Sequence, residues 1–300
     1  TVVTGPPLLP SAPMQPVGPG LVHRQTRHGV SILRAAGSRF DKRRFVGRAT
    51  NYMTYFASAC VAAFRVERPD VVVALTDPPI IGLAAWMTAR RHRVPLVMAF
   101  QDLFPEVAAL LPDFHSSAIN AALQSVNRFL VRRASVNVAI GETMRRRLIE
   151  DKGAPEARTV VIQNWADTGA ITPGDRENPF RREHGLTGQF VVMHSGNMGL
   201  SQSLNTIVDA AALLRDEPRV TFVFQGEGVS RPTLEGRVRE LGLQNVRFLP
   251  FAPKERLGES FAAADLFIVS LQRGLAGYIV PSKLYGILAA GRPYIAAVED

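Results

Sequence analysis

The residues best suited to chemistry stand near the end of the sequence, in the run Pro281-Ser282-Lys283. Proline suits the first turn of a helix, serine can cap free backbone N–H groups, and Gly291 with Pro293 ends the apolar stretch that follows. The free N–H groups and the dipole of a helix start attract anions, and Lys283 adds a full positive charge beside them. We therefore expect a diphosphate to bind here, although a capped helix whose lysine faces water would show the same local sequence.

Two further loops follow apolar runs that are predicted to be strands. Ser195-Gly196-Asn197 comes after the run 189–194, and Gln225-Gly226-Glu227 closes the run 219–225. Glycine and asparagine tolerate positive φ and let backbone approach a ligand closely, while a carboxylate can accept hydrogen bonds from sugar hydroxyls. Because parallel strands end at one edge of a sheet, both loops should lie beside Lys283. A tight turn without a ligand, or a glutamate that caps the next helix, is the alternative for each loop alone.

A third polar segment follows the predicted strand 95–100 in the first half of the chain. Asp102 and Glu106 stand in it, close to the carboxyl end of that strand. Either carboxylate could orient an acceptor hydroxyl or remove its proton, so both are candidate catalytic residues together with Lys283. The alternative for Asp102 is a cap on a helix that Pro105 helps to start.

The elements that must position these residues alternate between β-branched runs and helical patterns. The predicted strands cover 1–4, 29–35, 70–75, 95–100, 135–140, 159–163, 189–194, 219–225, 246–249, 265–270 and 293–298. The predicted helices cover 47–66, 79–92, 115–133, 141–152, 203–215, 231–242, 254–263 and 282–290. This alternation predicts an α/β protein with two Rossmann-like, doubly wound domains whose parallel sheets are covered on both faces. A polar passage after residue 165 separates them, so we expect domains at 1–168 and 169–300 that face a ligand-binding cleft.

The composition excludes several classes of protein. The single cysteine, Cys60, cannot form an internal disulfide, and the six histidines lack metal-binding spacing, so we expect a cytoplasmic location, no metal and no cofactor. The net charge of +9 comes from arginines in short, dispersed groups, which does not indicate a nucleic-acid partner. No apolar run reaches the length of a membrane span. Because the chain opens inside a predicted strand, we expect the first domain to lack its start.

A family resemblance is carried by five segments that occur in a fixed order. They are Asn51-Tyr52, Gln101-Asp102-Leu103, Asn164-Trp165-Ala166-Asp167, His194-Ser195-Gly196-Asn197-Met198-Gly199 and Pro281-Ser282-Lys283. Together they resemble family 4 glycosyltransferases of bacterial exopolysaccharide and O-antigen synthesis, such as colanic-acid and fucosamine transferases. The resemblance implies the GT-B fold, a nucleoside-diphosphate sugar donor, retention of anomeric configuration, and a glycan or polyprenyl-diphosphate-linked acceptor. It also implies a donor-binding set that comprises Ser195, Gly196, Asn197, Gln225, Gly226, Glu227, Pro281, Ser282 and Lys283. Family members usually have a further helical segment after the position of Asp300, so the resemblance implies that the second domain lacks its end.

The sequence departs from that family at two positions of the expected donor site. Many members carry a basic residue just after the glycine loop, whereas 200–202 has none, which puts more of the diphosphate charge on Lys283. Many also have a glutamate for the donor ribose where this chain has Gly286. The donor sugar and its nucleotide base are therefore left open.

We predict a retaining glycosyltransferase of the hexosyltransferase type that serves the synthesis of a cell-surface polysaccharide. A sugar-nucleotide epimerase on the same fold is the enzymatic alternative, and a non-catalytic fragment that binds nucleotide sugars or polyanions is the other. The stretch 44–65 places aromatic residues between arginines, and it could rest on the anionic inner face of a membrane. We favour the simpler interpretation, a buried amphipathic helix of the first domain.

Overall fold

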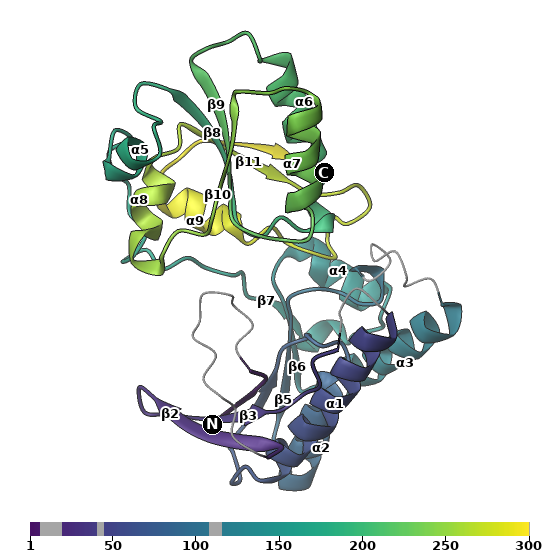
Figure 1. Ribbon diagram of the computed structural model, residues 1–300. Helices are drawn as coiled ribbons and strands as arrows, with labels where there is room; N and C mark the ends of the chain where they lie inside the picture. Colours follow the sequence, from purple (N-terminus) through teal and green to yellow (C-terminus); the bar gives the residue numbers. More distant parts are fainter. Residues whose placement is uncertain (7–19, 41–44, 108–115, 300) are drawn as a thin grey trace. The chain divides into compact units, whose positions relative to one another are not determined.

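The computed structural model describes residues 1–6, 20–40, 45–107 and 116–299. The chain divides into two compact units, Thr1–Ile162 and Gln163–Asp300 (Figure 1). This division falls before the polar passage that follows residue 165, whereas the sequence was interpreted with a boundary after residue 168. Both units are built from helices and mainly parallel strands, so the predicted α/β class is confirmed.

One sheet of the first unit has three strands in the order β1-β3-β2, with β1 at Val2–Thr4, β3 at Val30–Ala35 and β2 at Val22–Arg27. Strands β1 and β3 are parallel, while β2 and β3 form an antiparallel hairpin. His28 and Gly29 make its two-residue turn with φ values of 49° and 77°, the positive values that such hairpin turns require. Strand β2 was not predicted because its sequence, VHRQTR, is largely polar.

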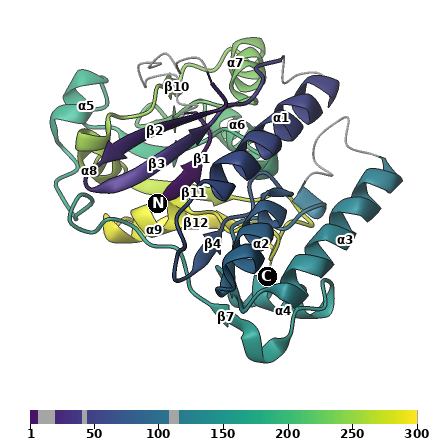
Figure 2. The ribbon, with the colours of Figure 1, turned by 90° about the horizontal axis from the view of Figure 1, so that it is seen from below.

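The other sheet of the first unit has four parallel strands in the order β4-β5-β6-β7. They span Val72–Ala74, Leu96–Phe100, Val136–Ala139 and Thr159–Val161. The helices are α1 at Phe45–Phe64, α2 at Ile81–His92, α3 at Ser117–Arg133 and α4 at Glu142–Glu150. Helices α1 and α2 lie side by side (Figure 2). Every predicted strand and helix of this unit is present to within a few residues.

Helix α1 buries one side and exposes the other. Ala59 and Ala62 are fully buried against Leu33 and Ala35 of β3, whereas Tyr52 and Met53 are exposed. This division of burial agrees with the favoured interpretation of an amphipathic helix that packs in the first domain. No helix in the described part of the chain is long and apolar enough to cross a bilayer.

The second unit is a five-stranded parallel sheet in the order β10-β9-β8-β11-β12. The strands span Val246–Leu249, Val220–Gln225, Phe190–Ser195, Leu266–Ser270 and Tyr294–Ala297 in that spatial order. The helices are α5 at Pro179–Glu183, α6 at Asn205–Leu213, α7 at Arg231–Glu240, α8 at Leu257–Ala262 and α9 at Lys283–Ala289. The short helix α5 was not predicted, and the predicted helix 254–263 divides into a 3₁₀ turn and α8.

Both faces of this second sheet are buried at its central strand, β8. Along β8, Val191 and Met193 belong to a core that also contains Phe267 and Ile287, while Val192 belongs to a second core on the opposite face. Period-two alternation places successive side chains on opposite faces, and here both sets are apolar. The predicted doubly wound architecture of the second domain is therefore confirmed.

A buried ion pair joins the start of this unit to its sheet. Asp265, at the beginning of β11, accepts hydrogen bonds from the guanidinium of Arg181, from Arg176 Nη1 at 2.6 Å and from the Val191 N–H at 2.7 Å. Burial alone would raise the pKa of Asp265, but the Val191 N–H and the two arginines hold it below its usual value. The ionised carboxylate thus connects α5 to the neighbouring strands β8 and β11.

Candidate functional site

The candidate site of the second unit lies where the order of the sheet reverses. The chain runs from β8 to β9 and β10 on one side and then returns to place β11 on the other side of β8. In open α/β sheets, ligands bind beyond the carboxyl ends of the strands at such a switch point. Strand β8 ends at Ser195 and leads directly into the glycine loop Gly196–Gly199.

Two of the predicted loops are joined by backbone hydrogen bonds. The Gly196 N–H donates to the Gln225 carbonyl at 2.9 Å, and the Met198 N–H donates to the Glu227 carbonyl at 2.8 Å. The expected convergence of the loops after β8 and β9 is therefore confirmed. Their contact with a ligand stays a prediction.

Gly226 allows these loops to meet. Its φ of +136° lies in the region that favours glycine, and a Cβ on this residue would stand 2.0 Å from the Gly196 carbonyl oxygen. A side chain at this position is therefore excluded both by backbone conformation and by space.

Gly226→Ala is expected to lower the free energy of unfolding by about 1–3 kcal/mol, because the added methyl group forces the loops after β8 and β9 apart. Donor binding should weaken in the same variant. The measurement is urea unfolding with calorimetric titration of a UDP-sugar. Gly236→Ala is the control. Gly236 lies inside α7, and a Cβ there would make only an ordinary contact, at 3.9 Å, with the end of the Arg239 side chain, so alanine should stabilise the protein by roughly 0.5–1 kcal/mol. Equal effects of the two substitutions would contradict the argument.

Lys283 lies beside the glycine loop. Its Nζ is 3.2 Å from His194 Nε2 and 3.3 Å from Gln202 Oε1, and a Cβ on Gly196 would stand 3.8 Å from it. Within the described residues, no carboxylate forms an ion pair with this ammonium group. Burial lowers the pKa of Lys283 to about 7, so the group is half protonated near neutral pH.

His194, next to Lys283, is a neutral neighbour of the ammonium group. Its ring is buried, and that burial together with the charge of Lys283 lowers its pKa to about 3. The imidazole is therefore neutral and can accept a hydrogen bond from Lys283 Nζ. A desolvated cation with neutral neighbours lacks a counter-charge, and a phosphate oxygen would supply one.

The start of α9 differs from the prediction. Helix α9 begins at Lys283, so Pro281 precedes its first turn, and the Ser282 side chain makes no capping hydrogen bond. The prediction that Ser282 caps the helix was wrong, because this residue already has helical φ and ψ of −61° and −21°. The predicted end of the helix is confirmed by Gly291, whose φ is +63°.

Three other residues of the predicted donor-binding set serve to hold the loops. Ser195 and Gln225 are buried, and the Ser195 hydroxyl donates to Gln225 Oε1 at 3.4 Å. Glu227 accepts a hydrogen bond from Arg231 Nη1 at 2.6 Å, and the same nitrogen donates to the Gly226 carbonyl at 2.9 Å. Asn197 is exposed at the loop tip. Direct contact of a donor with Ser195, Gln225, Glu227 or Asn197 stays a prediction.

Sequence reasoning did not single out His194, Gln202 or Arg231. His194 lay inside the segment that carried the family resemblance, and its position at the end of an apolar strand was the available signal. Gln202 and Arg231 reach the loops from a 3₁₀ turn and from α7. Their contacts depend on tertiary packing, which leaves no local pattern.

The two candidate carboxylates of the first unit have different surroundings. Asp102 is partly buried, and burial together with the negative charge of Asp77 raises its pKa. Glu106 forms an ion pair with Lys152 Nζ at 2.6 and 2.7 Å from its two carboxylate oxygens. Lys152 is 1% exposed and also donates to Gln124 Oε1 and to the Phe104 carbonyl. These contacts give Glu106 a structural role that the sequence had not indicated.

Glu106→Ala is expected to lower the free energy of unfolding by about 2–3 kcal/mol, because it leaves the buried Lys152 without its counter-charge. Burial already lowers the pKa of Lys152, and the bond to Glu106 opposes that shift. Guanidinium unfolding followed by circular dichroism measures the loss. Glu156→Ala removes the partner of Arg145 from an exposed pair, and it should cost less than about 1 kcal/mol. A similar loss in both variants would refute the structural role of Glu106.

Comparison with known proteins identifies the family. Residues 1–165 match the model of the glycosyl transferase 4-like domain, and residues 176–298 match the model of glycosyl transferases group 1. The chain therefore belongs to the glycosyltransferase family that these two domains define. The resemblance inferred from the sequence motifs is confirmed.

Two curated relatives and one solved structure are similar to the chain. Over 239 residues it is 28% identical to the probable glycosyltransferase WbjE of Pseudomonas aeruginosa, a match that covers 78% of this chain and 59% of WbjE. Over 164 residues it is 30% identical to the putative colanic acid biosynthesis glycosyl transferase WcaI of Escherichia coli. That match covers 53% of this chain and 40% of WcaI. The chain thus spans about half the length of the curated relatives it matches. HepE of Anabaena, solved with UDP and glucose, aligns with a TM-score of 0.67 at 20% identity over 90% of this chain and 68% of HepE, which confirms the GT-B fold.

Proposed function

We propose that the chain transfers a sugar from a nucleoside-diphosphate sugar to a glycan or lipid-linked acceptor during synthesis of a cell-surface polysaccharide. The observation that carries this proposal is the desolvated Lys283 beside the glycine loop, without a carboxylate partner among the described residues. The family membership, the names of WbjE and WcaI, and the UDP bound to HepE support it.

The chemical task of Lys283 in this proposal is to stabilise the diphosphate as it leaves. Negative charge grows on the departing group as the bond to the sugar breaks, and a fixed cation in a desolvated site stabilises that charge. A bound phosphate oxygen in turn favours the protonated lysine and raises its pKa from about 7. Neutral His194 and Gln202 orient the ammonium group without competing for its charge.

Retention of anomeric configuration and the role of Asp102 belong to the same proposal. The raised pKa of Asp102 suits a group that accepts a proton from an acceptor hydroxyl, whereas Glu106 is already paired with Lys152. The proposal involves no cofactor and no metal ion. NMR of the product anomeric proton tests retention, and Asp102→Asn with kcat lowered at unchanged KM would support the role of Asp102.

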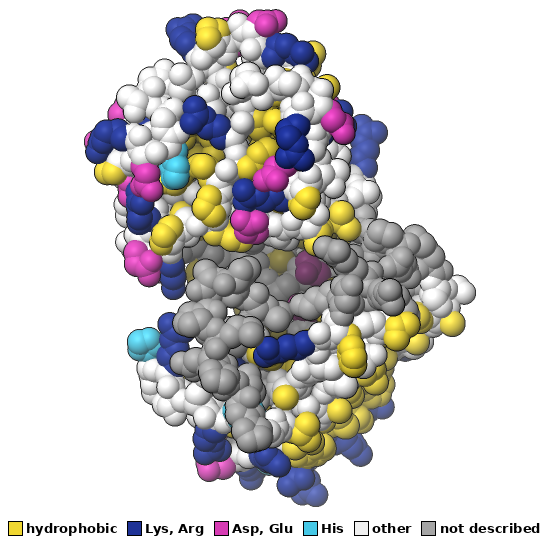
Figure 3. Space-filling view, in the orientation of Figure 1, with side chains coloured by type: hydrophobic (Ala, Val, Ile, Leu, Met, Phe, Trp, Pro, Cys, Tyr) yellow, Lys and Arg dark blue, Asp and Glu magenta, His cyan; other side chains and the backbone are white. Residues whose placement is uncertain are grey.

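A second proposal concerns contact of α1 with an anionic membrane from the cytoplasmic side. Hydrophobic side chains gather on the side of the first unit where α1 and α2 lie (Figure 3), and Tyr52 and Met53 are exposed there. Co-sedimentation with vesicles of rising phosphatidylglycerol content should increase for the wild type and fall for a Tyr52→Ser, Met53→Ser variant. Binding that does not change with lipid composition would remove this proposal.

The experiment for the main proposal is a product analysis. The chain is incubated with UDP-glucose, UDP-N-acetylglucosamine or GDP-mannose, with and without a polyprenyl-diphosphate-linked sugar. We expect release of nucleoside diphosphate and a longer lipid-linked glycan only when the acceptor is present. A donor sugar that changes configuration without acceptor would indicate an epimerase, and donor binding without any turnover would indicate a binding module. Either result overturns the proposed transfer.

A further inference from the structure

The segment 101–107 follows β5 in the first unit, and its backbone is held at successive carbonyl groups. The Asp102 carbonyl accepts a hydrogen bond from the Thr76 hydroxyl at 3.3 Å, and the Leu103 carbonyl accepts one from the Val107 N–H at 3.2 Å. The Leu103 side chain is 2% exposed, so it is buried as well. The backbone that carries Asp102 is therefore fixed both by its own turn and by the neighbouring strand β4, which Thr76 follows.

Lys152 makes the charge-assisted attachment of this segment. Its ammonium group donates to the Phe104 carbonyl at 2.9 Å, and Asn127 Nδ2 donates to the same oxygen at 2.5 Å. The ammonium group also donates to the two carboxylate oxygens of Glu106, at 2.6 and 2.7 Å, and to Gln124 Oε1 at 2.6 Å. Three side chains and one backbone carbonyl thus use all its N–H groups. Lys152, which stands just after α4, joins the segment to α3.

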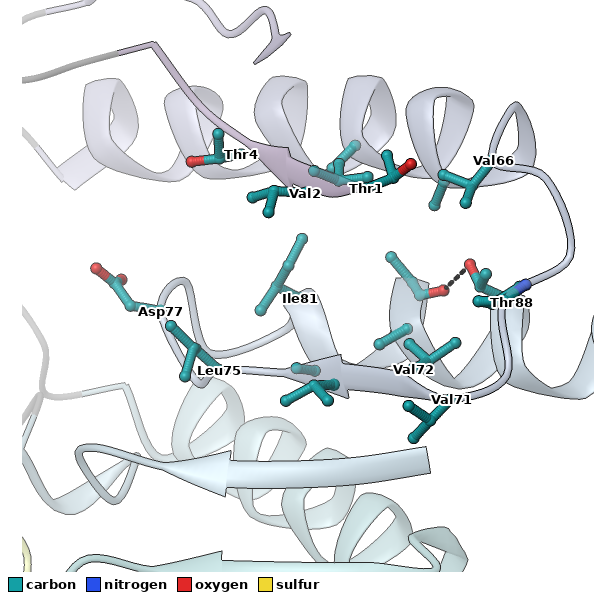
Figure 4. Close-up of a pocket in the computed structure, with 18 of the residues that line it drawn as sticks. Thr1, Val2, Thr4, Val66, Val71, Val72, Leu75, Asp77, Ile81 and Thr88 are labelled. Atoms are coloured by element: carbon teal, nitrogen blue, oxygen red, sulfur yellow. Dashed lines mark hydrogen bonds between the residues drawn. The ribbon is translucent and has the colours of Figure 1, made fainter. Parts of the chain in front are cut away.

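The carboxyl group of Asp102 contrasts with this fixed backbone. Within the described residues, its oxygens form no hydrogen bond and no ion pair. Burial, and then the negative charge of Asp77 at the end of the adjacent strand β4 (Figure 4), raise its pKa. A carboxylate that stabilises a fold pairs with donors, as Asp265 does with Arg181 and the Val191 N–H. An unpaired carboxyl group on an immobile backbone is instead suited to meet a substrate in one geometry.

We propose that Lys152 is a positioning residue, which holds the segment 101–107 so that the Asp102 carboxylate meets the acceptor hydroxyl of the proposed sugar transfer. The inference rests on the proposed function and adds to it a residue that touches no substrate, since Lys152 is 1% exposed. In that transfer the acceptor oxygen forms a bond to the anomeric carbon, the bond from this carbon to the diphosphate breaks, and Asp102 takes up the hydroxyl proton.

The contribution of Lys152 is geometric. Its ammonium group and the Glu106 carboxylate form a neutral pair, and the charge that acts on Asp102 is that of Asp77. Taking an ion pair out of water costs free energy, and an apolar pair of similar volume supports a fold equally well. What an apolar side chain lacks is a directed hydrogen bond to the Phe104 carbonyl. The buried ion pair therefore fits a role in placing this backbone better than a role in stability alone.

Two variants separate positioning from support of the fold. Lys152→Met should lower kcat about ten- to hundredfold and the melting temperature by about 4–8 °C, because the segment loses an anchor and Glu106 loses its partner. Adding Glu106→Leu removes the unpaired carboxylate, so the double variant should melt within about 2 °C of the wild type. Its kcat should stay as low as that of Lys152→Met, because neither apolar side chain can donate to the Phe104 carbonyl.

Initial rates of transfer to a polyprenyl-diphosphate-linked sugar, and melting followed by circular dichroism, measure these two effects. A third measurement is amide hydrogen exchange, which should be at least about tenfold faster for residues 102–104 in the double variant. Asn137→Ala is the matched control, since Asn137 is a fully buried side chain of the same unit that donates to the Val131 carbonyl at 2.9 Å. It should lower the melting temperature by a similar amount and leave kcat within about twofold.

The outcomes distinguish this inference from the proposed function. Recovery of kcat together with the melting temperature in the double variant would show that Lys152 only supports the fold. A further fall of kcat in the double variant would show that Glu106 itself acts on the acceptor, and unchanged amide exchange would show that the segment is held without Lys152. Each of these results overturns the positioning role while transfer by the wild type stands. If the wild type transfers no sugar, the proposed function fails and the positioning role falls with it.

Discussion

Lys283→Met is expected to weaken binding of a UDP-sugar about ten- to hundredfold, the effect of losing a charge-assisted hydrogen bond of about 1.5–3 kcal/mol. The same substitution should raise the free energy of unfolding by about 1–4 kcal/mol, because it replaces a buried cation without a counter-charge by an apolar side chain of similar length. Titration calorimetry and urea unfolding at pH 7 measure the two effects. Loss of affinity together with gain of stability separates a ligand-binding lysine from a structural one.

The pH dependence of the stability gain follows from the pKa of Lys283. The lysine has a pKa of about 7 in the folded protein against 10.5 for an exposed lysine. Between these values the unfolded chain binds more protons, so the stability of the wild type rises with pH across this window. The advantage of the methionine variant should therefore be largest at or below pH 7 and should shrink toward pH 10.

Lys254→Met is the matched control, since Lys254 is an exposed lysine of the same unit. It should leave both donor affinity and stability within about 0.5 kcal/mol of the wild type. If Lys283→Met binds the donor as well as the control does, the assignment of the diphosphate site is wrong. If it destabilises the protein, Lys283 is held by partners that the described contacts do not include.

The second large effect is expected for Asp265→Ala, which should lower the free energy of unfolding by about 3–5 kcal/mol. The substitution removes the buried carboxylate that pairs with Arg181, whose buried guanidinium then keeps only the half-exposed Glu177 as a counter-charge. It also removes the acceptor of the Val191 N–H. Urea unfolding followed by circular dichroism gives the value. Asp209→Ala, which breaks an exposed pair with Arg237, should cost less than about 1 kcal/mol. A loss as small as that of the control would contradict the buried ion pair.

The contribution of Asp265 also has a defined sign with pH. Its pKa in the folded protein is held below the ordinary 3.8. The stabilisation is therefore fully present above pH 3.8 and is lost as the pH falls through the lower, folded value. The difference between the wild type and Asp265→Ala should accordingly narrow only in strongly acidic solution.

The sequence predicted all five strands of the second unit, because each of them is an apolar run that can be recognised locally. The predicted strand 246–249 coincides with β10, and the glycine loops after β8 and β9 meet as the parallel order required. Strand β2 was missed because its polar residues show no alternation. This segment forms a strand because it pairs with β3, and a local sequence pattern does not predict that pairing.

The sequence allowed us to name residues of the candidate site, but it did not predict which side chains surround them. Lys283 could be named from its place beside Pro281 and Ser282. Its proximity to His194, which stands 89 positions earlier, and the burial that lowers its pKa depend on tertiary packing. Ser282 stands directly before the first helical residue as expected, but its helical backbone angles prevent the expected cap, and a local signature does not show those angles. Likewise, the Glu106–Lys152 pair joins positions that are 46 residues apart.

The most direct test of the diphosphate site is the number of protons taken up when donor binds. Titrations of the wild type with its best UDP- or GDP-sugar at pH 8, in buffers of different ionisation enthalpy, report this number. A lysine with a pKa of about 7 is mostly neutral at pH 8, so a bound diphosphate that restores its charge should draw in about 0.9 proton. Lys283→Met should take up none. Donor binding to the wild type without proton uptake, or with the same uptake in the variant, would contradict the central role of Lys283.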